Sequence, residues 1–174
     1  MNKFFNPLSY SLISQKPLRL TDVFGWHGHI PFAFAVTEML RPRLLVELGT
    51  HKGDSYCAFC QAVKSLNLDC LCYAVDSWKG DEHAGFYPKE ILKELRSHHD
   101  PLYGSFSTLL EMRFDEAVSR FSDGSIDLLH IDGLHSYEAV KHDFDTWLPK
   151  MSRRGVVLLH DISVRHQNFG VRKF

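Results

Sequence analysis

Five short apolar runs, separated by stretches with helical periodicity, constrain what this chain can fold into. The runs cover residues 43–50, 68–76, 107–112, 125–132 and 154–161, and most are continuously apolar. Continuous apolar runs are typical of strands that a parallel sheet buries on both faces. Helical patterns lie between them at 54–66, 88–99, from Asp115 onward and at 135–148. The sequence therefore predicts an α/β fold with a doubly wound parallel sheet covered by helices on both faces.

The chain has 174 residues, about the size of one structural domain. Residues 1–40, with their aromatic residues and prolines, are predicted to form an N-terminal helical cap on a domain that covers residues 41–174. The sequence stops soon after the fifth strand, where doubly wound domains often carry further strands. We therefore expect a sheet without its last strands, in a fragment of a longer chain. A homo-oligomer or the missing C-terminal segment is expected to cover the edge of the fifth strand.

Charge and the lengths of the apolar stretches argue against two classes of partner, nucleic acids and membranes. The formal net charge is −1 and basic residues are not clustered, so no nucleic-acid partner is expected. No apolar stretch approaches the roughly 20 residues of a membrane helix, and the start lacks a signal-peptide pattern, so we expect no membrane partner and a cytoplasmic location.

Four cysteines, at positions 57, 60, 70 and 72, could form a zinc site or a redox pair. The first two fall within a helical pattern and the last two alternate along a strand-like run. Free cysteine is among the most buried residue types, so buried core residues are the favoured interpretation.

Polar residues gather where the predicted strands end. Glu47 and Gly49 end the first strand, Asp76 ends the second, Asp132 ends the fourth, and His160 and Asp161 end the fifth. Ligands of open parallel sheets bind outside the carboxyl ends of the strands, so this distribution predicts a site along that edge.

The stretch "VELGTHKGDS" after the first strand is a glycine turn of the kind on which a ligand can lie. It may equally serve only to let helix and strand pack. The dinucleotide fingerprint is absent, since His51 occupies the place of its second glycine, and this disfavours a nicotinamide dehydrogenase. An acid at the end of the second strand, here Asp76, commonly binds ribose hydroxyls. A nucleoside without a pyrophosphate, such as S-adenosylmethionine, fits this pattern better.

Three stretches, "VELGTHKGDS", "YAVDSW" and "IDLLHIDGLHSYEAVKHDF…GVVLLHD", resemble class I S-adenosylmethionine-dependent methyltransferases. The likeness is to the domain-24 branch, and more distantly to catechol-type and macrolide-sugar O-methyltransferases. It implies a Rossmann-like sheet with S-adenosylmethionine as cofactor. By this resemblance, the methionine part would be lined by Glu47, Gly49, His51 and Gly53. Asp76 would hold the ribose, with Ser77 and Trp78 beside the adenosine.

Metal-dependent members of the family carry an acid after strand four, a base three residues later and two ligands after strand five. The resemblance implies that a divalent metal, Mg²⁺ or Mn²⁺, is held by Asp132, His160 and Asp161, with His135 as the catalytic base. Imidazole suits transition ions better than Mg²⁺, so His160 could instead lie outside the coordination shell, or no metal could bind. Helix capping or salt bridging remains an alternative for the two aspartates, and packing for His135.

The function expected from these patterns is S-adenosylmethionine-dependent, metal-assisted O-methylation. The acceptor would be a small hydroxylated molecule, such as a sugar or glycosylated metabolite, a choice that rests on the family resemblance. The alternative is a non-catalytic module that binds a nucleoside or a partner, attached to a larger enzyme such as a glycosyltransferase.

Overall fold

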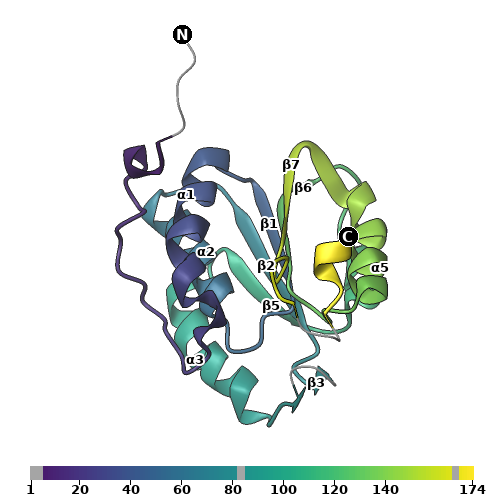
Figure 1. The fold of residues 1–174 in the computed structure, drawn as a ribbon. Helices are drawn as coiled ribbons and strands as arrows, with labels where there is room; N and C mark the ends of the chain where they lie inside the picture. The colour runs from purple at the N-terminus through teal and green to yellow at the C-terminus, as the bar shows by residue number, and fades with distance from the viewer. Residues whose placement is uncertain (1–5, 82–84, 166–168) are drawn as a thin grey trace.

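The computed structural model describes residues 6–81, 85–165 and 169–174. Its centre is a five-stranded parallel sheet with the strand order β5-β2-β1-β6-β7 (Figure 1). The strands are β1 (Leu44–Leu48), β2 (Leu71–Asp76), β5 (Ser107–Glu111), β6 (Ile126–Ile131) and β7 (Met151–Leu159). The predicted doubly wound, Rossmann-like parallel sheet is confirmed. A separate two-stranded ribbon is formed by β3 (Gly80–Asp81) and β4 (Gly85–Phe86).

Helices cover both faces of the sheet (Figure 1). One face carries α1 (Ile30–Leu40), α2 (Asp54–Ser65) and α3 (Glu90–Tyr103), and the other carries α4 (Phe114–Ala117) and α5 (Tyr137–Trp147). Short 3₁₀ segments are η1 (Pro7–Ser9), η2 (Phe24–His29), η3 (Val118–Arg120), η4 (Leu148–Lys150) and η5 (Val171–Lys173). None of the described helices is long and apolar enough to cross a lipid bilayer.

The strand in the middle of the sheet shows why the apolar runs are continuous. Successive side chains of a strand point to opposite faces, so Leu45 packs under α1 and α2 while Val46 and Leu48 pack under α5. All three are fully buried. Two hydrophobic cores thus sandwich one sheet, so apolar side chains are needed on both faces of the strand.

Some boundaries differ from the sequence prediction. The helix predicted to end at His99 continues through Pro101 to Tyr103, because burial of His99 and Tyr103 stabilises the last turn although proline removes one hydrogen bond. The fifth strand begins at Met151 instead of residue 154, with an irregular register against β6. The cysteines are all buried and free, which confirms the core interpretation.

Candidate functional site

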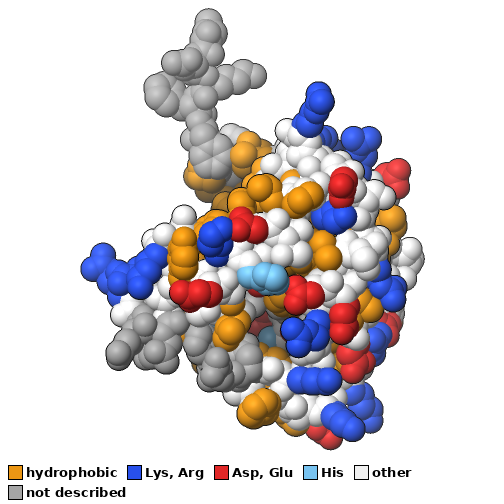
Figure 2. Space-filling view, turned by 90° about the vertical axis from the view of Figure 1, so that its right-hand side faces the viewer, with side chains coloured by type: hydrophobic (Ala, Val, Ile, Leu, Met, Phe, Trp, Pro, Cys, Tyr) orange, Lys and Arg blue, Asp and Glu red, His pale blue; other side chains and the backbone are white. Residues whose placement is uncertain are grey.

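A cavity of about 870 Å³ opens at the carboxyl ends of the strands. The glycine turn after β1 forms one side of it, the ends of β6 and β7 form another, and part of the N-terminal region forms a third. On the face drawn in Figure 2, acidic and basic side chains lie side by side and the surface is hollowed near its centre. The strand-end site predicted from the sequence is therefore a single concave space.

The glycine turn is shaped by one close backbone approach. Gly49 has a φ of +84°, and a Cβ there would lie 2.1 Å from the carbonyl oxygen of Asp132. No other residue fits at this position, because a side chain would collide with the chain that leaves β6. Gly49 therefore brings the turn against the loop that carries the strand-four acid.

The carboxylate of Asp76 closes the same turn from the other side. Its Oδ2 accepts the backbone N–H groups of Thr50 and His51, each at 2.9 Å, and its Oδ1 accepts that of Trp78 at 2.7 Å. Two N–H groups of the turn are thus bound within the protein and not offered to a phosphate. Asp76 is only 9% exposed, and Oδ1 keeps one lone-pair direction unused by these bonds.

Five of the residues predicted to bind a cofactor line the cavity, namely Gly49, His51, Gly53, Asp76 and Ser77. The structure places the other two behind its wall. Glu47 is fully buried in β1 and pairs with Nδ1 of His130 at 2.8 Å. The indole N–H of Trp78 donates to the carbonyl oxygen of His51 at 2.9 Å, and its side chain is buried.

Burial raises the pKa of Glu47, although the hydrogen bond with His130 opposes that effect. The carboxyl group therefore belongs to a buried polar pair that links β1 to its neighbour β6. In this position Glu47 supports the sheet beneath the cavity and does not itself form its surface.

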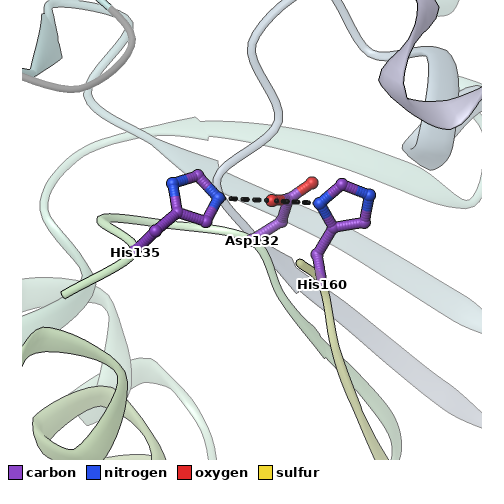
Figure 3. A group of neighbouring side chains, drawn as sticks. All are labelled: Asp132, His135 and His160. Carbon is purple, nitrogen blue, oxygen red and sulfur yellow. Dashed lines mark hydrogen bonds and ion pairs between the residues drawn. The ribbon is translucent and has the colours of Figure 1, made fainter. Parts of the chain in front are cut away.

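The residues predicted as metal ligands and base converge beyond Gly49 (Figure 3). Asp132 Oδ1 lies 3.2 Å from Nε2 of His135 and 3.1 Å from Nδ1 of His160. Asp161 completes the group, with Oδ2 3.2 Å from His135 Nε2 and Oδ1 3.1 Å from His160 Nδ1. Two carboxylates and two imidazoles thus share one small volume.

Electrostatic coupling within this cluster is strong. Burial opposes the charge on Asp132, but the contacts with His135 and His160 hold the pKa of this carboxyl group well below its usual range. Burial likewise disfavours a charged His160, yet Asp132 and Asp161 outweigh it and raise the pKa of that imidazole to about 10. The carboxylates therefore hold a cation, here the imidazolium itself.

The cluster has the donor set that a divalent metal needs. One ligand atom each from Asp132, His135 and His160 lies within 4.8 Å of the others. Mixed imidazole and carboxylate donors suit transition ions such as Mn²⁺ or Zn²⁺ more than Mg²⁺. Asp161 has a φ of +57°, which is a costly conformation for a residue other than glycine. Its carboxylate points toward the cluster.

Sequence reasoning missed Trp26 as part of the site. Its indole N–H donates to Asp132 Oδ2 at 3.1 Å, and its ring stacks on that of His160 with centroids 5.5 Å apart. Trp26 lies 106 residues before Asp132, within the region predicted to form an N-terminal helical cap. Only the fold brings the two together.

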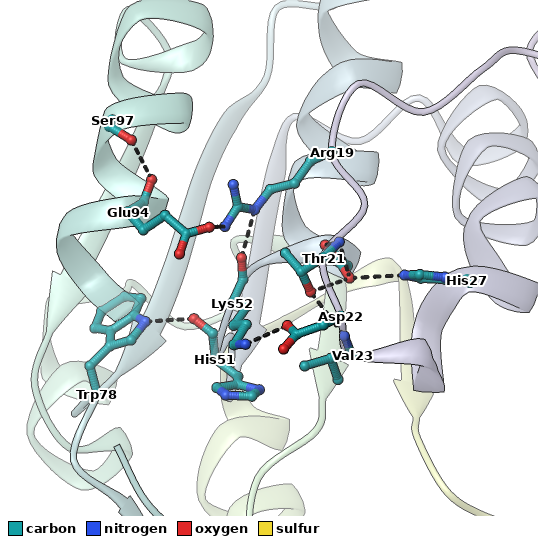
Figure 4. A network of polar contacts seen from close by, with 11 residues as sticks. Arg19, Thr21, Asp22, Val23, His27, His51, Lys52, Trp78, Glu94 and Ser97 are labelled. Atoms are coloured by element: carbon teal, nitrogen blue, oxygen red, sulfur yellow. Dashed lines mark hydrogen bonds and ion pairs between the residues drawn. The ribbon is translucent and has the colours of Figure 1, made fainter. Parts of the chain in front are cut away.

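The segment before η2 is fastened to the glycine turn (Figure 4). Arg19 Nε donates to the carbonyl oxygen of Lys52 at 2.7 Å, and Lys52 forms an ion pair with Asp22. Asp54 is the first residue of α2, but its side chain does not cap that helix. Its carboxylate instead accepts the hydroxyl of Thr21 at 2.8 Å. The N-terminal region is therefore an integral wall of the cavity.

The fold and the site define a class I methyltransferase domain. A family model described as "Methyltransferase domain" matches residues 46–162, and the chain belongs to that family. The solved structure of the O-methyltransferase TomG from Streptomyces achromogenes is similar, with a TM-score of 0.63 and 13% identity over 98% of this chain and 74% of that chain. A putative caffeoyl-CoA O-methyltransferase from Staphylococcus aureus has a TM-score of 0.61 and 14% identity over 86% of this chain and 68% of that one.

Two curated proteins match in sequence. The chain is 51% identical over 150 residues to the uncharacterized protein y4gI of Sinorhizobium fredii (strain NBRC 101917 / NGR234), which covers 86% of this chain and 16% of that protein. It is 29% identical over 144 residues to an uncharacterized protein of Acanthamoeba polyphaga mimivirus, which covers 79% of this chain and 60% of that protein. The chain thus spans only part of both relatives.

Proposed function

We propose that this domain binds S-adenosylmethionine in the cavity and transfers its methyl group to a hydroxyl oxygen of a small acceptor. The observation that carries the proposal is that one cavity contains both the glycine turn and the cluster of Asp132, His135, His160 and Asp161. Placing a methyl donor and an activated hydroxyl in one space supplies the alignment that the reaction needs. TomG, which shares the fold, is described in complex with S-adenosylmethionine.

The cofactor's binding follows from the shape of the turn. Gly49 and Gly53 let the turn pack closely against the Asp132 backbone and Leu95, and the methionine part lies against the backbone of this turn. The ribose hydroxyls bind the hydroxyl of Ser77 and the unused lone-pair direction of Asp76 Oδ1. The turn offers no free pair of N–H groups to a phosphate, which suits a cofactor that carries none.

The two aspartates and His160 would hold a divalent metal. A bound metal supplies a Lewis acid that lowers the pKa of an acceptor hydroxyl. The described cluster fits this role, because its net charge with neutral imidazoles is negative and its donors already converge. The imidazole content favours Mn²⁺ over Mg²⁺.

His135 removes the acceptor proton in this proposal. Its Nε2 faces both Asp132 and Asp161 at 3.2 Å, and these carboxylates stabilise the imidazolium that forms when it takes the proton. Stacking on the ring of Phe169, with centroids 4.7 Å apart, fixes the orientation of the imidazole. The acceptor we propose is a small hydroxylated molecule, such as a sugar or a glycosylated metabolite.

The test is a calorimetric titration of S-adenosylmethionine into metal-stripped protein, repeated with Mn²⁺ and with Mg²⁺. We expect micromolar binding in all three conditions, and methyl transfer to a panel of hydroxylated acceptors only with a metal. His135→Gln should bind the cofactor normally and lose methyl transfer. Absence of cofactor binding by folded protein would contradict the proposal.

A further inference from the structure

One largely buried carboxyl group in this cavity has no hydrogen-bond donor among the described residues. Four other buried acids each accept hydrogen bonds: Glu47 from His130, Asp54 from Thr21, Asp76 from the glycine turn, and Asp127 from Ser152. Asp143, on α5, is 8% exposed and lines the cavity, yet no residue in the described parts of the chain donates a hydrogen bond to it. Its oxygens are accessible from the cavity, so a bound ligand can satisfy them.

Phe114 and Gly133 surround this carboxyl. A Cβ placed on Gly133 would lie 2.6 Å from Cε2 of Phe114 and 3.4 Å from Oδ2 of Asp143. The edge of the aromatic ring therefore occupies the space that a side chain at position 133 would take, with the carboxyl group next to it. All three residues line the cavity.

Phe114 lies beside the end of β2. The backbone N–H of Met112 donates to the carbonyl oxygen of Asp76 at 2.9 Å, and Phe114 follows two residues later. A nucleoside whose ribose is bound at Asp76 and Ser77 would therefore direct its base toward Phe114. An aromatic face and a buried hydrogen-bonding group are what a base needs for recognition.

The charges around Asp143 favour its neutral form. Burial is the main cause that raises the pKa of Asp143 to about 7, while His142 opposes the shift and nearby Asp115 adds to it. Arg113, Glu138 and Asp132 also line this cavity, from the β5–α4 loop, α5 and the end of β6. A protonated carboxyl presents an O–H donor beside a carbonyl acceptor. Adenine presents the complement, an exocyclic amine beside a ring nitrogen, which an amide side chain pairs in the same way.

We propose that Asp143, with Phe114, forms the subsite that recognises the adenine base. The Asp143 carbonyl oxygen accepts a hydrogen bond from the N6 amine, and its O–H donates to the adjacent ring nitrogen. The ring of Phe114 stacks on the base. This inference rests on the proposed function, because it assigns the base of the cofactor bound there.

The experiment compares S-adenosylhomocysteine with its purine analogue, in which a hydrogen replaces the N6 amine and the ring nitrogens are unchanged. Wild-type protein should bind the adenine compound at least about tenfold more tightly at pH 6, because a site built to pair the amine penalises its loss. Asp143→Ala should lose most of that preference. Asp143→Asn, which keeps both the donor and the acceptor, should retain it.

The pH dependence separates pairing from a purely structural role. Wild-type affinity for the adenine compound should fall severalfold between pH 6 and pH 8.5, as the carboxyl loses its proton, whereas the affinity of Asp143→Asn should stay constant. Asp145→Ala is the matched control, since Asp145 is an exposed acid on the same helix paired with Lys141.

The possible outcomes distinguish the two proposals. If wild-type protein binds neither compound, the proposed function fails and this inference fails with it. If it binds both equally, or if folded Asp143→Ala keeps its preference for adenine, cofactor binding stands and the assignment of Asp143 is overturned.

Discussion

The two ends of the cavity differ in how their polar groups are satisfied. At the glycine turn, Asp76 accepts three backbone N–H groups, and the indole of Trp78 donates to a carbonyl oxygen of the same turn. At the other end, Asp132, Asp161 and His160 are held together mainly by charge. Neither ring nitrogen of His160 makes a well-directed hydrogen bond within the described part of the chain.

This difference indicates that the glycine turn is a preformed scaffold and that the cluster of Asp132, Asp161 and His160 is a ligand-binding site. A turn whose hydrogen bonds are made internally keeps one shape with or without a cofactor, so it can present a preformed surface. A cluster of like charges around imidazoles is stable only with a cation among them. The turn therefore provides shape and the cluster provides chemistry.

The largest effect should come from breaking the scaffold. Asp76→Ala would leave three backbone N–H groups without acceptors, at a cost of about 3 kcal/mol or more in the free energy of unfolding. Urea denaturation measures this loss, and binding of S-adenosylmethionine should disappear with it. Asp76→Asn should lose less, because its carbonyl can still accept two of the three groups.

Ser77→Ala is the matched control for that prediction, since Ser77 lines the cavity without closing the turn. It should leave stability unchanged and weaken cofactor binding modestly. If Asp76→Ala unfolds at the same urea concentration as wild type, the interpretation of Asp76 as the scaffold of the turn is wrong.

The second effect concerns the cluster. Asp132→Asn should weaken Mn²⁺ binding by about 100-fold or more, because losing a direct ligand costs at least as much as losing its supporting residue. Electron paramagnetic resonance of free Mn²⁺ gives the affinity directly. Asp123→Asn, at an exposed acid paired with Lys150, is the control and should bind Mn²⁺ as wild type does. Unchanged Mn²⁺ affinity in Asp132→Asn would exclude the cluster as the metal site.

A smaller effect should follow from loss of the Trp26 hydrogen bond. Trp26→Phe keeps an aromatic ring beside His160 but removes the donor to Asp132, and Mn²⁺ affinity should fall by about tenfold. Cofactor binding in the absence of metal should not change.

Trp147→Phe is the control for this change. The indole nitrogen of Trp147 is buried without a partner in the described structure, so its removal should leave Mn²⁺ affinity unaltered. Equal Mn²⁺ affinities of wild type and Trp26→Phe would show that the indole N–H does not position Asp132.

The smallest effect belongs to an exposed pair at the rim of the cavity. His142 lies 2.8 Å from Asp115, and this hydrogen bond raises the pKa of His142 above its ordinary 6.5. The pair stabilises the fold fully below pH 6.5, and this stabilisation is lost as the pH rises through the higher folded-state value. His142→Gln should therefore cost at most about 0.5 kcal/mol at pH 5.5 and nothing at pH 9. A larger loss at pH 9 than at pH 5.5 would contradict this sign.

The fold was predictable because burial leaves a local trace in the sequence. The apolar runs around Val46 and Leu128 have no polar alternation, which only a sheet covered on both faces requires. Boundaries such as the helix end at Tyr103 were not predictable, because packing of the last turn overrides the helix-ending signal of Pro101.

The site was predictable where its residues follow strands. Asp132, His160 and Asp161 meet because adjacent parallel strands end at one edge, and the sequence alone implies that. The contact of Trp26 with Asp132 and the contact of Asp54 with Thr21 depend on the path of the N-terminal region, which no periodicity encodes. The sequence does not distinguish Asp143 from other acids on its helix, because only the structure shows that this carboxyl group is buried.

The most direct test is a crystal structure of the protein with S-adenosylhomocysteine and Mn²⁺, with data collected at the manganese absorption edge. We expect one anomalous peak among Asp132, His160 and Asp161, and nucleoside density that extends from Asp76 to Asp143 within the same cavity. A manganese peak elsewhere, or a nucleoside bound away from the glycine turn, would contradict the account.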